Sequence, residues 1–322
     1  MLTYDISAGS LFVSAELRSK HAAEPSNRPL LLPVLWDVTE PPQNAAAWSL
    51  PSTVCDLAWA PDNAQVATAQ VNGSVGLWDV QRQTCSRTLG RLAKPVNAVA
   101  GSKHGHAQFV AGSDDGSIQV WDTRARRPAA VLRHTAAPLK SRKSALSMPV
   151  LSVACNADAS TAWAGTLDGR VWQWDVRSAA EPVHVMAAHT DMVTGLALAR
   201  DAERVSSLSA DGTVRVWDVR PFVPAEAANA TERGHPRCAA LLKGAVAGAG
   251  AHLHRVAWNP QDTQVLAAGD DGCVQVWDVD SGVPLASVPG HAGAVTGIAT
   301  HAAGSWLATC SVDGSAVLGK LC

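Results

Sequence analysis

The sequence predicts an all-β fold, a seven-bladed β-propeller formed by a single domain that spans residues 1–322. The first observation is a recurring run that reads as a tight turn followed by a strand, and residues 209–219 are its clearest copy. Asp211-Gly212 supplies the turn, because glycine tolerates the positive φ that a two-residue hairpin needs. Residues 213–219 then alternate small, β-branched and aromatic side chains with the strand period of two.

The second observation is a Trp-Asp pair that occurs six times, with separations of 42, 43, 53, 43 and 60 residues. Five of these pairs follow a turn residue and Gly, with the turn residue six positions before the Trp. A WD40 repeat forms one four-stranded propeller blade from about 40–45 residues, so the two long separations indicate inserted loops. A seventh copy keeps the turn Asp313-Gly314 but has lost its Trp, which brings the count to seven, a common number for ring closure. The pairs begin at Trp36, Trp78, Trp121, Trp174, Trp217 and Trp277.

The first blade is irregular. We expect its strands at 2–6, 11–17 and 30–38, with a polar loop at 18–29 between the second and the third. No strand precedes residue 2 to close the last blade from outside, so the outer strand of that blade is expected to be missing. Since an open sheet edge is a liability, a missing upstream segment or a partner's strand is favoured.

The other six blades are each expected to contain three clear strands, with Trp48 opening the second blade. From the second blade to the seventh, the predicted strands are 54–59, 65–69 and 74–80; 96–100, 108–112 and 117–122; 150–154, 161–165 and 170–176; 193–198, 204–208 and 213–219; 253–258, 264–268 and 273–279; and 295–300, 305–310 and 315–321.

Composition excludes several classes of protein. The net charge of −2 argues against wholesale electrostatic binding to nucleic acid or to an anionic membrane. The seven cysteines are scattered without a CxxC pair, which indicates reduced thiols in an intracellular protein rather than zinc ligands or disulfides. No apolar run approaches a membrane span, and we expect no signal peptide.

No sequence feature points to catalysis or to a cofactor. Phosphate-binding loops and nucleophile elbows are absent from the sequence. His252 and His254 stand two apart at the start of a strand, but the sequence offers no evident third ligand, so we expect no metal site. We therefore predict no enzyme activity, no cofactor and no small-molecule substrate.

The histidines indicate a hydrogen-bond network inside the blades. His189 precedes the turn residue Asp211 by 22 residues, and His291 precedes Asp313 by the same number. A Ser or Thr near the end of the second strand, Ser207 or Ser209 in the fifth blade, would complete an Asp–His–Ser/Thr–Trp network. The predicted network residues are His134, Asp168, Trp174, His189, Ser207, Asp211, Trp217, His291 and Asp313.

Ser, His and Asp also form catalytic triads, but here the same set recurs from blade to blade, which favours a structural role. In the fourth blade, His134 precedes Asp168 by 34 residues, and the excess of 12 gives the size of an insertion.

Two groups of charged residues are candidate contact surfaces. Residues 123–157 contain seven Arg or Lys and no Asp or Glu, which indicates either solvated loops or an anchor for an acidic protein surface or an RNA backbone. The aspartates of the turns form either an acidic rim or plain turn chemistry, and the insert at 221–237 is a further loop of contact length. The candidate partner contacts are Arg133, Lys140, Arg142, Lys143, Arg177 and Arg220.

A closer resemblance rests on residues 192–198, on the stretch 213–222 that ends in Arg-Pro-Phe, on the segment Val-Pro-Gly-His-Ala-Gly at 288–293, and on Gly319 in place of Trp. These features resemble the family of the 40-kilodalton WD40 protein of the spliceosomal U5 small nuclear ribonucleoprotein. The resemblance is good over 189–322, moderate over 54–188 and poor over the first 50 residues. The sequence departs from the family pattern in lacking a basic N-terminal extension, in a basic insert at 135–147, and in a small-residue loop in the sixth blade.

The resemblance implies a nuclear, non-catalytic scaffold in pre-mRNA splicing. Its implied partners are the homologue of pre-mRNA-processing-splicing factor 8 and other U5 proteins, with mostly indirect RNA contact and no membrane. An alternative is a substrate receptor of a cullin-4 ubiquitin ligase, because Trp-Asp-x-Arg occurs at 121–124, 174–177 and 217–220. The same arginine occurs in many propellers without such a partner.

Overall fold

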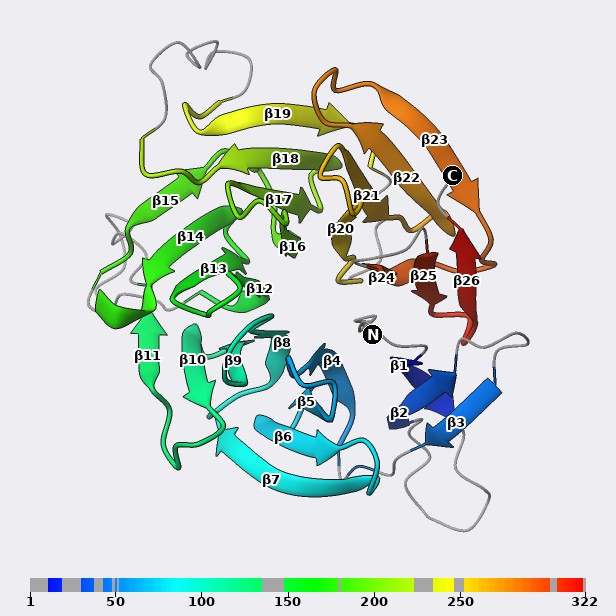
Figure 1. Cartoon of the computed structure of the whole chain (residues 1–322). Helices are drawn as coiled ribbons and strands as arrows, with labels where there is room; N and C mark the ends of the chain where they lie inside the picture. The colour runs from blue at the N-terminus through cyan, green and yellow to red at the C-terminus, as the bar shows by residue number, and fades with distance from the viewer. Residues whose placement is uncertain are drawn as a thin grey trace.

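The computed structural model describes the backbone of residues 11–18, 30–37 and 43–47. It describes residues 50, 52–134, 148–178, 181–222, 234–245, 252–301 and 306–320 with their side chains. Over these ranges the chain forms antiparallel sheets set around a central axis (Figure 1), with a single 3-10 turn, η1 (Val176–Ser178). Among the residues that the structure describes, no helix is long and apolar enough to cross a membrane.

Seven sheets are described, and each runs in chain order from one strand to its hydrogen-bonded neighbour. The sheet β1–β3 has three strands, the next five sheets have four strands each, and the last sheet has three. The strands are β1 (Leu11–Arg18), β2 (Leu30–Asp37) and β3 (Gln43–Ala47); β4 (Val54–Trp59), β5 (Gln65–Gln70), β6 (Ser74–Asp79) and β7 (Thr84–Arg91); β8 (Val96–Gly101), β9 (Gln108–Ser113), β10 (Ser117–Asp122) and β11 (Ala130–Arg133); β12 (Val150–Cys155), β13 (Thr161–Thr166), β14 (Arg170–Asp175) and β15 (His184–Ala187); β16 (Val193–Leu198), β17 (Arg204–Ser209), β18 (Thr213–Asp218) and β19 (Cys238–Lys243); β20 (Val256–Trp258), β21 (Gln264–Ala268), β22 (Cys273–Asp278) and β23 (Pro284–Pro289); and β24 (Val295–Thr300), β25 (Trp306–Ser311) and β26 (Ala316–Lys320).

The predicted all-β propeller is confirmed. Five hydrophobic clusters lie between neighbouring sheets and join six packed blades, from β4 to β26. The sheet β1–β3, described as backbone only, lies in the ring between the last of these blades and the first (Figure 1). The first predicted blade corresponds to this sheet, while its predicted strand at 2–6 lies outside the described residues.

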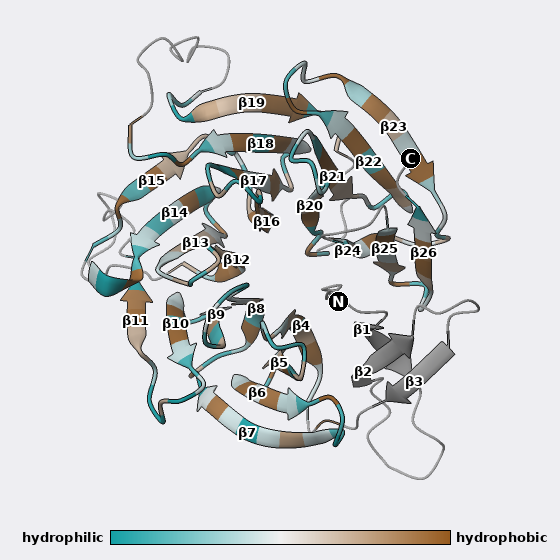
Figure 2. Ribbon diagram, in the orientation of Figure 1, coloured by the Kyte–Doolittle hydropathy of each residue, from teal (hydrophilic) through white to brown (hydrophobic). Residues whose placement is uncertain are grey.

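The outer strands of the blades carry little signal in the sequence. Strands such as β7 and β23 were not predicted, because they bury little apolar surface and lack a regular pattern; every residue of β23 is exposed. The inner and middle strands follow the prediction closely, since they are nearly continuous buried apolar runs. Figure 2 shows a different contrast, with apolar residues concentrated in the strands and hydrophilic residues at the turns.

The turns between the second and third strands of the blades form as the Asp-Gly motif requires. Gly212 has φ of +78°, and the Oδ1 atom of Asp211 accepts the N–H of Thr213 at 2.9 Å. At Gly272 a side chain is also sterically excluded, because a Cβ atom would lie 2.5 Å from the carbonyl oxygen of His291. From the second blade to the seventh, these turns place one aspartate or asparagine of each blade at the same end of the sheets.

The largest fully buried side chains of the core include the tryptophans of the repeat. Burying an aromatic side chain of this size stabilises a fold by roughly 1.5–3 kcal/mol. Each tryptophan lies near the outer part of its sheet, so the repeat itself supplies the packing between blades. These residues are Trp121, Trp174, Trp217 and Trp277.

Candidate functional site

The fifth blade brings four predicted residues together in one hydrogen-bonded chain. The indole Nε1 of Trp217 donates to the Ser207 hydroxyl at 2.7 Å, and that oxygen lies 2.7 Å from Nε2 of His189. Nδ1 of His189 lies 2.9 Å from a carboxylate oxygen of Asp211, which also accepts the N–H of Thr190. This network runs from the outer part of the blade to its turn, and Thr213 donates to the remaining carboxylate oxygen of Asp211.

Protonation of this chain follows from its environment. Burial lowers the pKa of His189 despite the nearby Asp211 carboxylate, so the imidazole is neutral near pH 7. A neutral ring that donates from Nδ1 to Asp211 must accept the Ser207 proton at Nε2. Burial opposes ionisation of Asp211, but its hydrogen bonds with His189 and Thr213 outweigh burial and lower its pKa below the usual range. With His189 and Asp211 held this way, Ser207 faces no open substrate site.

The seventh blade forms the same hydrogen-bond network, but without a tryptophan. Nε2 of His291 lies 2.8 Å from the Thr309 hydroxyl, and Nδ1 lies 2.7 Å from the Ser315 hydroxyl. The nearest carboxylate oxygen of Asp313 is 3.8 Å from Nδ1, so Ser315 bridges the two groups. Burial would raise the pKa of Asp313, but hydrogen bonds from Ser315 and Ala292 lower it to about 2.

The hydrogen-bond network predicted for the fourth blade is not formed. Neither ring nitrogen of His134 has a hydrogen-bond partner among the described residues, and the same is true of Nε1 of Trp174. The ring of His134 packs instead against Trp172, with centroids 5.2 Å apart. Trp172 donates its Nε1 to the Thr166 hydroxyl at 3.3 Å, and Thr166 donates to Asp168. The hydrogen-bond chain is therefore displaced by two residues along both strands.

The physical reason is the residue at the centre of the middle strand. Strand pairing places Ala164 where the fifth blade has Ser207, so no hydroxyl is available to link His134 with Trp174. The blades divide by this position: a hydroxyl accepts the indole N–H in the second and fifth blades, and an alanine stands there in the third, fourth and sixth. The aligned residues are Thr68, Ser207 and Thr309 on one side, and Ala111, Ala164 and Ala267 on the other. The sequence shows whether this hydroxyl is present, because the deciding residue lies four positions before each turn aspartate or asparagine.

The second blade shows that histidine is replaceable. Nε1 of Trp78 donates to Thr68 at 3.1 Å, and Thr68 also accepts the side-chain amide of Gln70 at 3.2 Å. Ser74 connects Gln70 to the turn residue Asn72. A side-chain amide thus provides the donor and acceptor that the imidazole provides in other blades. This replacement indicates that the hydrogen-bond network serves to stabilise the blade.

A second candidate site is the central channel, where the inner strands β4, β8, β12, β16, β20 and β24 line a cavity of about 260 Å³. One buried ion pair crosses it: Nη2 of Arg255 lies 2.9 Å from Oδ2 of Asp56, which also accepts the Val99 N–H at 2.8 Å. The two residues belong to the second and sixth blades, so the pair joins opposite parts of the ring.

Four other blades leave space for this ion pair. At the equivalent position the third, fourth, fifth and seventh blades carry only small residues, namely Ala98, Ser152, Gly195 and Gly297. Gly195 is required for another reason also, because a Cβ atom there would lie 2.8 Å from the His254 carbonyl oxygen. Burial and the adjacent Asp56 raise the pKa of the Cys55 thiol to about 11, so this cysteine is a poor nucleophile at neutral pH.

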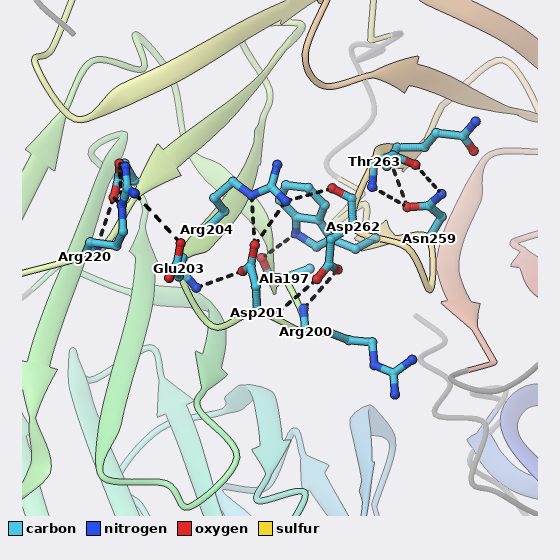
Figure 3. A network of polar contacts seen from close by, with 12 residues as sticks. Ala197, Arg200, Asp201, Glu203, Arg204, Arg220, Asn259, Asp262 and Thr263 are labelled. Atoms are coloured by element: carbon cyan, nitrogen blue, oxygen red, sulfur yellow. Dashed lines mark hydrogen bonds and ion pairs between the residues drawn. The ribbon is translucent and has the colours of Figure 1, made fainter. Parts of the chain in front are cut away.

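A polar network covers one face of the ring where the fifth and sixth blades meet (Figure 3). The buried carboxylate of Asp262 accepts the backbone N–H groups of Arg200 and Asp201, both at 2.9 Å. Arg204 donates to Asp201 at 3.0 Å and to the Asp262 carbonyl at 2.9 Å, and its guanidinium lies over the ring of Trp258, 5.2 Å from the centroid. The network fixes adjacent loops of two blades relative to each other.

The structure places the predicted partner contacts on two opposite faces. Arg133 ends β11 and pairs in register with Ser117, beside the Asp-Gly turns. Arg177 and Arg220 follow strand ends at the opposite face and are both exposed. Lys140, Arg142 and Lys143 lie outside the described residues.

Two arginines of the Trp-Asp-x-Arg motifs are neutralised by their own aspartates. Arg220 forms a two-pronged ion pair with Asp218, and Arg124 forms one with Asp122. In all three copies the backbone N–H of the arginine donates to the aspartate of its motif. Two of the three motifs therefore present to a partner a guanidinium that is already paired.

Comparisons with known proteins agree with this architecture. The family model described as nucleolar protein 10-like, N-terminal domain, matches residues 36–221, and the model of the WD domain, G-beta repeat, matches 243–278 and 282–318. The propeller domain of Cps50 (Swd1) from Myceliophteria thermophila superposes with a TM-score of 0.77 and 17% sequence identity, covering 100% of this chain and 97% of that one. At this identity the likeness shows the fold alone.

Curated relatives are named as splicing proteins. The U5 small nuclear ribonucleoprotein 40 kDa protein of Dictyostelium discoideum is 26% identical over 84% of this chain and 70% of its own length. Pre-mRNA-splicing factor cwf17 of Schizosaccharomyces pombe is 28% identical over 89% and 78%, and the human U5 40 kDa protein is 29% identical over 70% and 57%. These relatives confirm the resemblance drawn from the sequence. The chain belongs to the β-propeller family described as nucleolar protein 10-like, N-terminal domain, and it carries WD40 repeats.

Proposed function

We propose that this chain is a non-catalytic scaffold of the U5 small nuclear ribonucleoprotein, and that it acts in pre-mRNA splicing in the nucleus. The observation that carries the proposal is the extent of the match to relatives named as U5 or splicing proteins, which covers 84% and 89% of the chain. The match therefore includes nearly the whole ring rather than single repeats.

The geometry supports a scaffold rather than an enzyme. The Ser, His and Asp side chains that resemble a triad are joined to each other and to Trp217 inside the blade. The central channel is crossed by a buried ion pair that joins two blades. Rigid blades with polar loops on both faces can hold several partners at fixed positions.

The proposed partners are the homologue of pre-mRNA-processing-splicing factor 8 and other U5 proteins, with mostly indirect RNA contact. Arg124 and Arg220 are paired with aspartates, which reduces their attraction for phosphate. The net charge of −2 supports protein rather than RNA as the main partner.

Affinity purification of the tagged full-length chain from its own cells tests the proposal. Quantitative mass spectrometry is expected to recover the large splicing scaffold and other U5 proteins at near-equal amounts with the bait. A stoichiometric complex that lacks them would contradict the proposal, and a set of nucleolar proteins in their place would point to a role suggested by the family model's name.

The alternative, a cullin-4 substrate receptor, rests on the exposed arginines of the Trp-Asp-x-Arg motifs. The double variant Arg177→Ala/Arg220→Ala distinguishes the two proposals. A scaffold of the U5 particle keeps its U5 partners in this variant, whereas a ligase receptor loses its adaptor. Arg126→Ala/Arg127→Ala is the matched control, because both arginines are exposed and lie outside the three motifs.

A further inference from the structure

Three potential metal ligands converge beside the start of the sixth blade. His252 and His254 are two residues apart on an extended segment, so both side chains project toward the same side. The structure brings Asp270, from the turn after β21, to both of them: its Oδ1 atom lies 3.1 Å from Nδ1 of His252 and 2.9 Å from Nε2 of His254. The third ligand that was not evident in the sequence is supplied by the fold.

The imidazole of His254 is held in the form that binds metals. Its Nδ1 atom lies 2.6 Å from the carbonyl oxygen of Val295, and a carbonyl oxygen can only accept, so Nδ1 carries the proton. The lone pair of a neutral ring is then on Nε2. A hydrogen bond from the second ring nitrogen to a backbone carbonyl is the usual support of a metal-bound histidine.

Nε2 of His254 faces the carboxylate of Asp270 away from solvent. The residue is 5% exposed, and Nε2 lies 2.9 Å from Oδ1 of Asp270 without making a hydrogen bond of good geometry. A lone pair on Nε2 and a carboxylate oxygen at this distance repel each other unless a proton or a metal ion supplies positive charge there. The arrangement therefore favours a positive charge, which a cation held by both side chains would provide.

We propose that His252, His254 and Asp270 bind a divalent cation of the zinc class. Two imidazole nitrogens and one carboxylate oxygen suit zinc better than magnesium or calcium, which prefer oxygen ligands. The donor atoms lie within 4.8 Å of one another, and tetrahedral zinc with bonds of about 2.0–2.1 Å requires spacings of roughly 3.3 Å. Small movements of the half-exposed His252 side chain complete this geometry, and water takes the fourth position.

The cation would fasten two segments that already touch. The N–H of Ala268 donates to the carbonyl oxygen of Arg255 at 3.0 Å, which aligns the turn holding Asp270 with the segment holding both histidines. The guanidinium of Arg255 extends to Asp56 across the channel, so the ion pair and the metal site share one backbone segment. A bound cation therefore stabilises the position from which Arg255 crosses the ring.

Zinc binding to the purified full chain, without a polyhistidine tag, tests the proposal. Isothermal titration calorimetry with zinc chloride is expected to give one site per chain, and zinc is expected to raise the melting temperature. His252→Ala and Asp270→Asn each weaken binding by at least about 100-fold, because each removes one of three ligands. His252 is half-exposed, so its variant is expected to fold even if Asp270→Asn does not.

The chain provides a matched control in His104 and His106, an exposed pair with the same spacing. The double variant His104→Ala/His106→Ala should bind zinc within about twofold of the wild type. Absence of a stoichiometric site in the wild type would overturn the proposal. It would be overturned equally if His252→Ala left the affinity unchanged, or if the control variant lost binding to the same extent.

Discussion

At the scale of single residues, the decisive feature is the hydroxyl at the centre of the middle strand. Where Ser207 is present, it links an indole, an imidazole and a carboxylate into one buried chain. Where Ala164 replaces it, the histidine and the tryptophan of the same blade are separated and the chain moves to Thr166. In the fifth blade, His189 and Asp211 both lie in this network. The prediction for the fourth blade overlooked Ala164, which stands where the connecting hydroxyl is needed.

Ser207→Ala is expected to destabilise the fold by about 1–3 kcal/mol, because it leaves Nε1 of Trp217 and Nε2 of His189 buried without partners. Ser206→Ala is the control on the same strand. The Ser206 hydroxyl donates to the Ala197 carbonyl, which also accepts the indole N–H of Trp258 and so stays satisfied. Urea denaturation measures both variants, and equal losses of stability would contradict this account.

Acidification is expected to destabilise the folded protein. Burial lowers the pKa of His134, His189 and His291 in the folded state, whereas an unfolded histidine titrates at about 6.5. The unfolded state therefore binds more protons below pH 6.5, and stability falls as the pH decreases through that range. The lowered pKa of Asp313, about 2, adds a further loss below about pH 4.

The midpoint of urea unfolding is thus expected to be lower at pH 5.5 than at pH 7.5. In His189→Gln the difference between the two midpoints is smaller, because one buried histidine no longer titrates. A midpoint that stays constant or rises on acidification would show that the buried imidazoles are not the groups that couple stability to pH.

At the scale of strands and turns, the sequence was informative wherever apolar residues are buried continuously. The inner strands β4, β12 and β16 are mainly buried, and their bounds follow from composition and from the flanking turns. The outer strand β23 is wholly exposed, so neither hydropathy nor period marks it, and only pairing with β22 makes it a strand. Hydrogen bonding to a neighbour is a long-range property that a local pattern does not record.

Gly195→Ala is expected to destabilise the fold by about 1–3 kcal/mol. Its Cβ atom would approach the His254 carbonyl oxygen to 2.8 Å and the Val256 nitrogen to 3.1 Å, which forces β16 and β20 apart. Gly290→Ala is the matched control, because a Cβ atom there has no neighbour within 4 Å among the described residues. If thermal unfolding showed the two variants to be equally stable, close packing of these strands would not be needed for stability.

At the scale of the whole molecule, the ring is closed by contacts that no repeat pattern contains. The ion pair between Asp56 and Arg255 joins residues almost 200 positions apart, counted from their numbers, and each stands at a position where other blades carry a small residue. The repeat predicted where the blades are, but these two exceptions to the repeat carry the contact across the channel. The site formed by His252, His254 and Asp270 was missed for the same reason.

Asp56→Asn is expected to destabilise the chain by about 3–5 kcal/mol, since it leaves the buried Arg255 guanidinium without its counter-ion. The double variant Asp56→Asn/Arg255→Met should be more stable than the single Asp56→Asn variant, because no unpaired charge remains buried. Urea denaturation of the wild type, both single variants and the double variant gives the coupling energy. Strictly additive effects would mean that the two side chains do not depend on each other.

The identity of the RNA that accompanies the purified chain is the most direct test of the proposed scaffold role. Sequencing that RNA after native affinity purification is expected to show U5 RNA enriched well above other spliceosomal RNAs, even though the chain itself makes little direct RNA contact. Recovery of no RNA, or of ribosomal precursor RNA with U5 RNA at background, would contradict the assignment to the U5 particle.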